Sequence, residues 1–263
     1  MTMLIFGDLV GNAGLQAVRE ALPVLREQVH PDLVIANLEN IANGKGITPE
    51  LVTRAFDLGI DVATTGDHAW DERAGIPLYD QESARLLRPA NFPPGVPGKG
   101  WTTVTRGSVT IAIVNLIGRV FFRAQYDDPF RAAETWLATL FPSPPRITLV
   151  DFHAEATSEK RAMGFSLDGK VTAVWGTHTH VPTADEQLLP KGTAYLTDVG
   201  MTGAQHSVIG VETGPILTAF RTQMSARVKP EESRPWEVNA LVLDVDEGTG
   251  KARAVRRLRE ILV

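Results

Sequence analysis

Short apolar runs recur along the chain, and five of them stop abruptly at carboxylate, amide or imidazole side chains. A run of this length bounded by turn residues predicts a buried strand. The five stretches are Met3-Leu-Ile-Phe-Gly-Asp8, Leu33-Val-Ile-Ala-Asn-Leu-Glu39-Asn40, Val62-Ala-Thr-Thr-Gly-Asp67-His68, Thr148-Leu-Val-Asp151-Phe-His153 and Thr172-Ala-Val-Trp-Gly-Thr-His178-Thr-His180. The pattern therefore predicts five strands that each deliver polar groups at one end.

Segments with helical periodicity lie between the first three of these strands. Apolar residues recur at helical spacing from Leu15 to Leu25, and Pro23 is expected to kink or split that helix. Thr48 followed by Pro49 is an N-cap with proline at the first helical position, and Gly59 is expected to end this second helix. The order strand, helix, strand predicts parallel strands joined by right-handed crossovers.

The second half is expected to hold more strands and fewer helices. Short helical pieces are expected in 71–87, an ordered proline-rich loop in 88–100, and a helix from Asp128-Pro129 to about Leu140. The other apolar runs predict strands. These are a hairpin over 101–106 and 109–116, strands near 146–151, 171–176, 192–196 and 216–221, and a final hairpin over 238–245 and 252–258.

This element order predicts an α/β fold in which two sheets pack together and helices cover their outer faces. The length of 263 residues favours a single domain over residues 1–263, because one core of this size is common in α/β proteins.

Composition narrows the classes of function. A net charge of -5 argues against a stable nucleic-acid complex, which needs a basic face. The chain has no cysteine, so disulfides, thiolate metal sites and cysteine nucleophiles are excluded. The start lacks the pattern of a signal peptide, and no run of 18 apolar residues suggests a membrane span. A cytoplasmic protein without membrane contact is expected.

The polar groups at the strand ends are expected to meet. In open α/β sheets, ligands bind beyond the carboxyl ends of the strands. One such residue alone says little: Asp8 could cap a helix or sit in a turn, and a lone histidine is usually a surface residue. The pattern gains weight because four of the six histidines follow predicted strands, namely His68, His153, His178 and His180.

Oxygen and nitrogen donors without sulfur suit Mn, Fe, Co, Ni or Zn rather than Ca or Mg alone. Seven such groups exceed the needs of one tetrahedral ion, and they suit two ions bridged by a carboxylate and a solvent oxygen. Two ions ~3.5–4 Å apart can clamp the attacking and leaving oxygens of a displacement at phosphorus. The seven groups are Asp8, Glu39, Asn40, Asp67, His153, His178 and His180.

The same motifs resemble those of the calcineurin-like metallophosphoesterases, and more closely those of their bacterial YmdB-like branch. The likeness spans almost the whole chain and is carried by Gly7-Asp8, Asn37-Leu-Glu39-Asn40, Gly66-Asp67-His68, Asp151-Phe-His-Ala-Glu-Ala-Thr-Ser-Glu-Lys160, Gly176-Thr-His178-Thr-His180, Asn115-Leu-Ile-Gly-Arg119 and Thr197-Asp-Val-Gly-Met-Thr-Gly203. It implies the αββα metallophosphoesterase sandwich and a phosphodiesterase that acts on 2′,3′-cyclic nucleotides.

The resemblance also implies roles for individual residues. Asp8, Asn40 and His180 would hold one ion, and Asp67, His153 and His178 the other. Glu39 would bridge the two ions, which are expected to be Fe or Mn, with Zn, Co or Ni as alternatives. A hydroxide between the ions would attack phosphorus, and His68 would protonate the leaving ribose oxygen as the general acid. The alternative for His68 is a structural hydrogen bond to a neighbouring carboxylate.

Two positions depart from the pattern. The wider superfamily usually has a histidine two residues after the first aspartate, where this chain has Val10, and Asn40 would supply that ligand. The YmdB-like branch normally has asparagine where this chain has Asp67. The change adds one negative charge, so the cluster should bind anions less well than its asparagine counterpart.

Two further residues are predicted near the substrate. Arg119 could contact phosphate or stack on a base, although a surface salt bridge explains it equally well. His206 lies in a glycine-flanked loop near the expected site and is a second candidate for ligand contact.

The leading interpretation is therefore a two-metal phosphodiesterase acting on a small-molecule phosphodiester or cyclic nucleotide. A phosphomonoesterase or nucleotidase would use the same ions with a different pocket. A metal-dependent regulator that binds nucleotide with little turnover is a third alternative. The sequence leaves homo-oligomerisation open.

Overall fold

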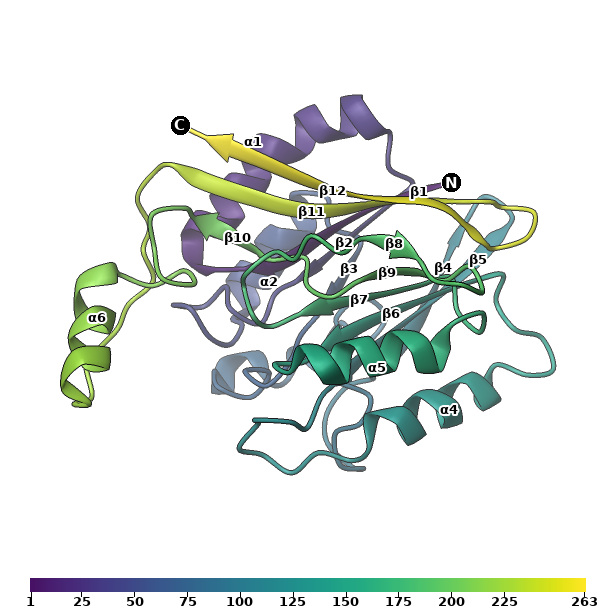
Figure 1. The fold of residues 1–263 in the computed structure, drawn as a ribbon, viewed down its shortest axis with the longest axis horizontal. Helices are drawn as coiled ribbons and strands as arrows, with labels where there is room; N and C mark the ends of the chain where they lie inside the picture. The colour runs from purple at the N-terminus through teal and green to yellow at the C-terminus, as the bar shows by residue number, and fades with distance from the viewer.

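A computed structural model describes residues 1–263 and contains two six-stranded sheets stacked face to face (Figure 1). The first sheet has the order β12-β11-β10-β1-β2-β3. Strands β1, β2, β3 and β10 are parallel to one another. Strand β11 runs antiparallel to β1 and β10, and the edge strand β12 runs antiparallel to β11. Their bounds are β1 Thr2–Leu9, β2 Leu33–Asn37, β3 Val62–Thr64, β10 Met201–Ala204, β11 Trp236–Val245 and β12 Ala252–Leu262.

The second sheet has the order β4-β5-β6-β7-β9-β8. Its four central strands are parallel, and an antiparallel strand closes each edge. The bounds are β4 Trp101–Arg106, β5 Val109–Ile117, β6 Ile147–His153, β7 Ala173–Thr177, β8 Gln187–Leu188 and β9 Ala194–Leu196. The predicted hairpins at 101–116 and 238–258 are both confirmed.

Helices cover the outer faces of both sheets, except α6, which projects from the sandwich. They are α1 Gly11–Val29, α2 Pro49–Asp57, α3 Leu78–Gln81, α4 Pro129–Thr139, α5 Thr157–Leu167 and α6 Thr213–Thr222, with a 3₁₀ turn at Arg73–Gly75. The predicted N-caps are present: the hydroxyl of Thr48 accepts from the N–H of Leu51, and the carboxylate of Asp128 accepts from Phe130. None of the helices combines the length and apolarity that a membrane crossing demands.

Strand β1 shows how the layers arise. Successive side chains of a strand point to opposite faces of its sheet. Met3 and Ile5 belong to the apolar cluster between the two sheets, whereas Leu4 and Phe6 pack into the cluster that includes the buried face of α1. A third cluster joins the second sheet to α4 and α5. The expected four-layer αββα sandwich is therefore confirmed.

Several local predictions need correction. Residues 216–221 form part of helix α6 rather than a strand, because a short apolar run has no period that separates the two structures. Helix α5 and strand β10 were not expected. Helix α1 runs on through Pro23, which lies on its exposed side. The carbonyl that loses its N–H partner there can be solvated by water, so proline is tolerated.

Candidate metal centre

The two sheets bring the predicted ligands to one edge of the sandwich. Asp8 lies near the end of β1, and Glu39 follows β2. Asp67 follows β3, His153 ends β6 and His178 follows β7. The first three residues come from one sheet and the two histidines from the other, so the site exists only because the sheets are stacked with their carboxyl edges together.

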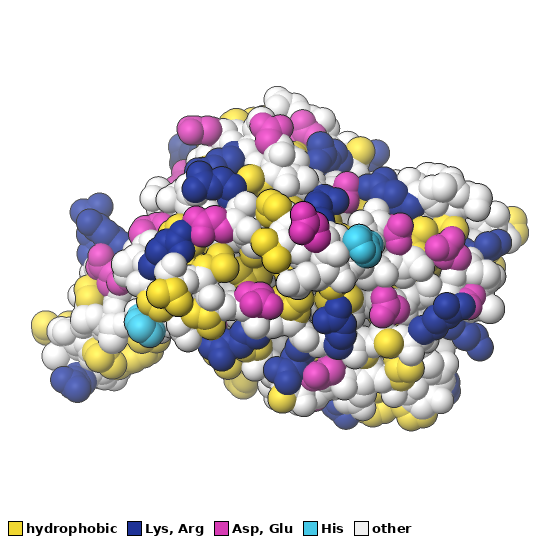
Figure 2. All heavy atoms as spheres, turned by 90° about the horizontal axis from the view of Figure 1, so that it is seen from above, with side chains coloured by type: hydrophobic (Ala, Val, Ile, Leu, Met, Phe, Trp, Pro, Cys, Tyr) yellow, Lys and Arg dark blue, Asp and Glu magenta, His cyan; other side chains and the backbone are white.

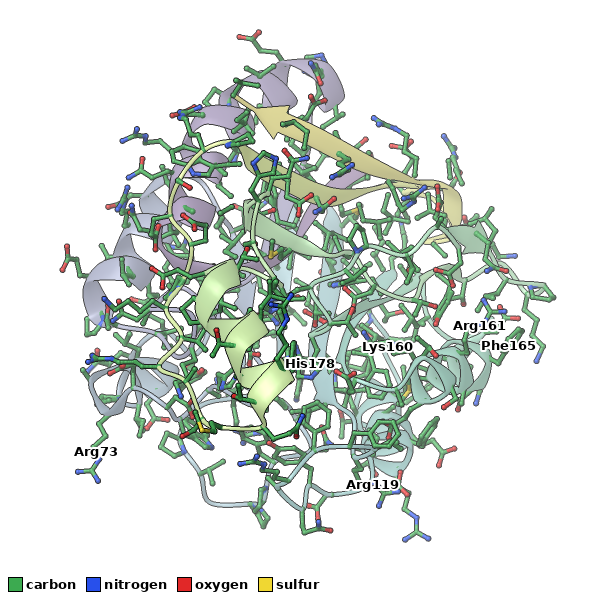
Figure 3. All side chains as sticks on the ribbon, turned by 60° about the vertical axis from the view of Figure 1, so that its left-hand side comes forward. Arg73, Arg119, Lys160, Arg161, Phe165 and His178 are labelled. Carbon is green, nitrogen blue, oxygen red and sulfur yellow. The ribbon has the colours of Figure 1, made fainter.

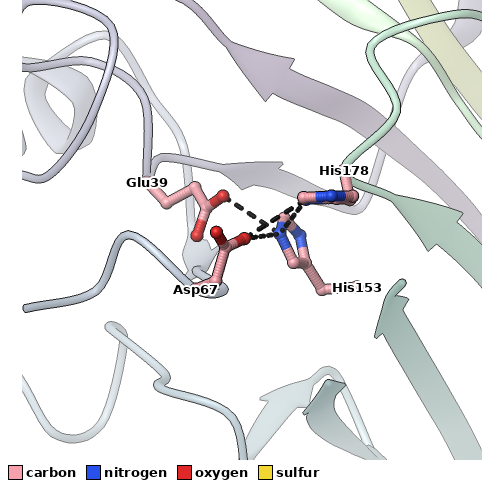
Figure 4. A group of neighbouring side chains, drawn as sticks. All are labelled: Glu39, Asp67, His153 and His178. Carbon is pink, nitrogen blue, oxygen red and sulfur yellow. Dashed lines mark hydrogen bonds and ion pairs between the residues drawn. The ribbon is translucent and has the colours of Figure 1, made fainter. Parts of the chain in front are cut away.

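Four of these side chains form a tight group (Figure 4). One donor atom each from Glu39, Asp67, His153 and His178 lies within 4.8 Å of the others. Nε2 of His153 is 3.0 Å from Oε1 of Glu39, 3.1 Å from Oδ1 of Asp67 and 3.0 Å from Nδ1 of His178. Two carboxylates and two imidazoles therefore aim their donor atoms at one small region.

Asp8 and Asn40 have buried oxygens without a partner. Oδ2 of Asp8 accepts from the backbone N–H of His178 at 3.0 Å, but its Oδ1 has no hydrogen bond. The amide nitrogen of Asn40 donates to the carbonyl of Gly44 at 3.0 Å, and its Oδ1 has no partner. A buried oxygen without a donor is costly. A cation next to these oxygens removes that cost, so the residues fit a metal ion.

His180 lies outside the group of four. Its Nδ1 donates to the carbonyl of Ile209 at 2.8 Å, which leaves Nε2 free to act as a ligand. His180 lines the same cavity as Glu39, Asn40 and His178. His178 and His180 both have left-handed backbone angles, with φ of 102° and 64°. Such angles are unfavourable outside glycine and mark positions held in place by their surroundings.

The group is electrostatically arranged for positive charge. Burial alone would lower the pKa of His153, but the negative charges of Glu39 and Asp67 outweigh it and hold that pKa well above its ordinary value. Burial would likewise raise the pKa of Asp67, yet hydrogen bonds from His153 and His178 hold it well below its usual range. Carboxylates packed around one point stabilise a cation there.

A second layer of polar contacts fixes His153. Its Nδ1 lies 3.0 Å from the hydroxyl of Thr177, which donates to Oδ1 of Asp151 at 2.8 Å. Thr64 donates to the other oxygen of Asp151 at 2.5 Å. Burial raises the pKa of Asp151 to about 7, partly offset by these hydroxyl donors and by His153. This series of hydrogen bonds orients the ring of His153 so that Nε2 points at Glu39 and Asp67.

Two contacts of charged side chains were not predicted from the sequence. Oε2 of Glu155 lies 3.1 Å from Nε2 of His178. Lys160 of α5 forms a buried ion pair with Asp198 and also donates to the carbonyl of Thr177 at 2.8 Å. Glu155 and Lys160 lie inside the motif that begins at Asp151, but nothing in their spacing shows which strand-end residue each contacts.

His68 sits beside the group of four. Its Nδ1 is 3.0 Å from Oδ2 of Asp71, and its Nε2 is 3.8 Å from Oδ2 of Asp67. The backbone N–H of His68 donates to Oε2 of Glu39 at 3.1 Å. The ring lines the cavity next to the cluster. The expected alternative of a hydrogen bond to a neighbouring carboxylate is present, and such a bond also orients an acid.

Arg119 and His206, the two residues predicted near the substrate, lie outside the group of four. Arg119 points to Asp128, with 3.2 Å between Nη2 and Oδ2, and its backbone N–H donates to Glu159. Its side chain is half exposed. Figure 3 shows Arg119 at the lower edge of the molecule, away from His178. His206 is exposed and is not among the residues that line the cavity beside the cluster. Neither side chain belongs to the group of four.

A two-sheet α/β sandwich with carboxylates and imidazoles at shared strand ends defines a metallophosphoesterase. The chain belongs to the family described as YmdB-like protein, whose sequence model matches residues 4–258. It is 42% identical over 258 residues to the 2′,3′-cyclic-nucleotide 2′-phosphodiesterase of Bacillus subtilis, covering 98% of this chain and 96% of that protein. The protein is accordingly a phosphoesterase, and the group of Glu39, Asp67, His153 and His178, which could hold a metal ion, supports a metal-dependent phosphodiesterase.

Solved structures agree with this assignment. A protein from Thermus thermophilus superposes with a TM-score of 0.92 at 41% identity, covering 100% of both chains. A phosphatase from Mycoplasma pneumoniae superposes with a TM-score of 0.93 at 30% identity, covering 99% of this chain and 93% of that one.

Proposed function

We propose that the protein hydrolyses 2′,3′-cyclic nucleotides. The observation that carries the proposal is the convergence of Glu39, Asp67, His153 and His178, beside the unpartnered oxygens of Asp8 and Asn40. The relative from Bacillus subtilis bears the name of a 2′,3′-cyclic-nucleotide 2′-phosphodiesterase, which supports this substrate class. It also favours an enzyme over a regulator that binds nucleotide without turnover.

The proposal includes two ions, Fe or Mn, with Zn, Co or Ni as alternatives. Asp8, Asn40 and His180 would hold one ion, Asp67, His153 and His178 the other, and Glu39 both, consistent with a donor set of oxygen and nitrogen only. Bound in this way, the ions would polarise phosphoryl oxygens and lower the pKa of a water. The buried positions of Asp8, Glu39 and His153 keep their donors shielded from bulk solvent.

His68 would supply the proton that the leaving ribose oxygen needs. Asp71 accepts from Nδ1 of His68 in this arrangement, so the ring presents Nε2 to the cavity. The backbone contact from His68 to Glu39 fixes the position of the ring relative to the cluster. Cleavage of the bond between phosphorus and the 2′ oxygen would release a 3′-nucleotide.

The test is product analysis on protein loaded with Mn²⁺ or Fe²⁺. We expect 2′,3′-cyclic AMP to give 3′-AMP, and bis-p-nitrophenyl phosphate to be cleaved faster than p-nitrophenyl phosphate. A chelator should abolish both reactions. Faster hydrolysis of the monoester would show a phosphomonoesterase instead, and bound metal without any hydrolysis would show a regulator.

A further inference from the structure

The cavity beside the metal cluster extends well beyond the reacting groups. It has a volume of about 650 Å³, within the usual range for a small-molecule site. The polar part of its lining includes Glu39, Asn40, His68, His178 and His180. The apolar part of its lining includes Val181, Val208, Ile209, Val211, Ile216 and Phe220.

Helix α6 contributes Ile216 and Phe220 to this apolar lining, which we call the apolar wall, and none of its residues is fully buried. It projects from the sandwich at the left of Figure 1, and Figure 3 shows it beside His178. No residue of α6 is buried, and Phe220 is 64% exposed. Figure 2 shows hydrophobic side chains gathered at the same end of the molecule. Ile216 and Phe220 are four residues apart, so they share one face of the helix.

The residues on either side of α6 are attached to the sandwich by backbone contacts. The N–H of Glu212 donates to the carbonyl of Lys229 at 3.0 Å, and Val211 and Pro230 form a β-bridge. The carboxylate of Glu232 accepts from the backbone N–H of Asn12 at 3.1 Å and of Ala13 at the start of α1. The segment that carries α6 is thus attached at both ends, while the apolar side chains of the helix are not buried by other parts of the protein.

The chemistry of the cavity specifies what fills it. None of its lining residues is lysine or arginine, so phosphate charge can be balanced only at the metal cluster. A second phosphate group would have no cationic partner. The apolar part of the lining suits an uncharged group with a broad apolar face. A nucleobase meets this description, since its π-face stacks well on an aromatic side chain.

We propose that Ile216 and Phe220 of α6, together with Ile209, bind the nucleobase of the substrate by apolar contact and stacking. This inference rests on the proposed function and names the residues that would hold the base. The aliphatic and aromatic side chains of the wall offer no hydrogen-bonding group to a base edge. The hydroxyl of Thr179, which also lines the cavity, is already engaged with the backbone: it lies 3.4 Å from both the carbonyl and the N–H of Val181. All four bases should therefore be accepted with similar efficiency.

The test compares nucleotides with an analogue that has no base. The wild type, Phe220→Ala and Leu217→Ala are assayed in the Mn²⁺-loaded form on 2′,3′-cyclic AMP, 2′,3′-cyclic UMP and ribose 2′,3′-cyclic phosphate. Leu217 lies on the same helix, is 40% exposed and does not line the cavity, so it is the matched control. Phe220→Tyr keeps an aromatic face and should behave like the wild type.

We expect Phe220→Ala to lower kcat/KM for the two nucleotides about tenfold, mainly through KM. The abasic analogue should be cleaved equally well by all variants. An equal loss on the analogue, or no loss on the nucleotides, overturns the inference. So does a shift in oligomeric state of Phe220→Ala by light scattering together with equal loss on all substrates, which would make α6 an interface between copies. Failure of the wild type on all three substrates refutes the proposed function itself.

Discussion

Glu155 and His178 face each other in the cavity, with 3.1 Å between Oε2 of the carboxylate and Nε2 of the ring. The other ring nitrogen, Nδ1, lies 3.2 Å from Oδ1 of Asp67 and points into the group of four. A carboxylate that accepts the N–H of a ligand histidine, on the ring nitrogen that does not face the metal, fixes both its tautomer and its orientation. Glu155 thus leaves Nδ1 of His178 as the nitrogen that faces the group of four, the candidate metal site.

Removing this carboxylate should weaken metal binding. Glu155→Ala is expected to lower Mn²⁺ affinity about tenfold, as outer contacts to metal-binding histidines do elsewhere. Glu155→Gln should retain most of it, because its amide oxygen still accepts from Nε2. Calorimetric titration measures both. Glu134→Ala, an exposed glutamate on α4, is the control. Equal affinities of Glu155→Ala and the wild type would contradict the prediction.

Replacing His68 should slow catalysis according to the leaving group. His68→Ala is expected to cut kcat for 2′,3′-cyclic AMP by about 10²–10⁴, because the ribose oxygen needs a proton as it leaves. Hydrolysis of bis-p-nitrophenyl phosphate should fall much less, since p-nitrophenolate leaves without one. Metal content should stay at the wild-type level.

The matched control is His30→Asn, which changes an exposed histidine with a left-handed backbone angle at the end of α1. It should behave as the wild type on both substrates. A purely structural role for His68 would show as equal losses on the two substrates.

Charge at the cluster should tune anion binding. Asp67→Asn keeps an oxygen donor but removes one negative charge, so it is expected to retain metal and bind phosphate more tightly. We expect inhibition by inorganic phosphate to strengthen about fivefold, a small part of the Coulomb energy of a unit charge at ~4 Å. Competition assays and metal analysis check this. Unchanged or weaker phosphate binding would refute the charge argument.

Asp151 should make the stability of the metal-free protein depend on pH. Its folded pKa of about 7 exceeds the ordinary value of 3.8, so the folded protein takes up a proton that the unfolded chain has lost. This contribution to stability is complete below pH ~4 and disappears as the pH rises to about 7.

The variant Asp151→Asn lacks this titration. As the pH rises from 4 to 7, the free energy of unfolding of the variant should therefore increase relative to that of the wild type, by as much as roughly 4 kcal/mol. Urea denaturation in the presence of chelator measures both curves. A difference between wild type and variant that stays constant with pH would disprove the assignment.

The buried pair of Lys160 and Asp198 should be important for stability. Both side chains are only 1% exposed, and Asp198 also accepts from the backbone N–H groups of Thr179 and Gly200. Lys160→Met leaves the carboxylate buried without its cation, which costs about 3–5 kcal/mol. Urea denaturation measures the loss, with Lys170→Met on the surface as control. A cost below about 1 kcal/mol would show that Asp198 is satisfied by backbone donors alone.

The sequence by itself determined the elements that depend on local pattern. Apolar runs predicted the central strands, and the capping residues Thr48 and Asp128 marked helix starts that the structure confirms. The placement of Asp8, Glu39, Asp67, His153 and His178 at strand ends predicted their convergence. Parallel strands carry their carboxyl ends to one edge, so a residue's place in its strand fixes its place in the fold.

Only the tertiary structure decided the features that depend on contacts between distant segments. Residues 216–221 form a helix although their pattern suited a strand, and this helix meets the metal-site cavity through Ile216 and Phe220. The contacts of Glu155 with His178 and of Lys160 with Asp198 depend on how α5 and its leading loop pack on β7. Local propensity is a property of a few neighbouring residues, whereas these pairs are chosen by packing across the whole core.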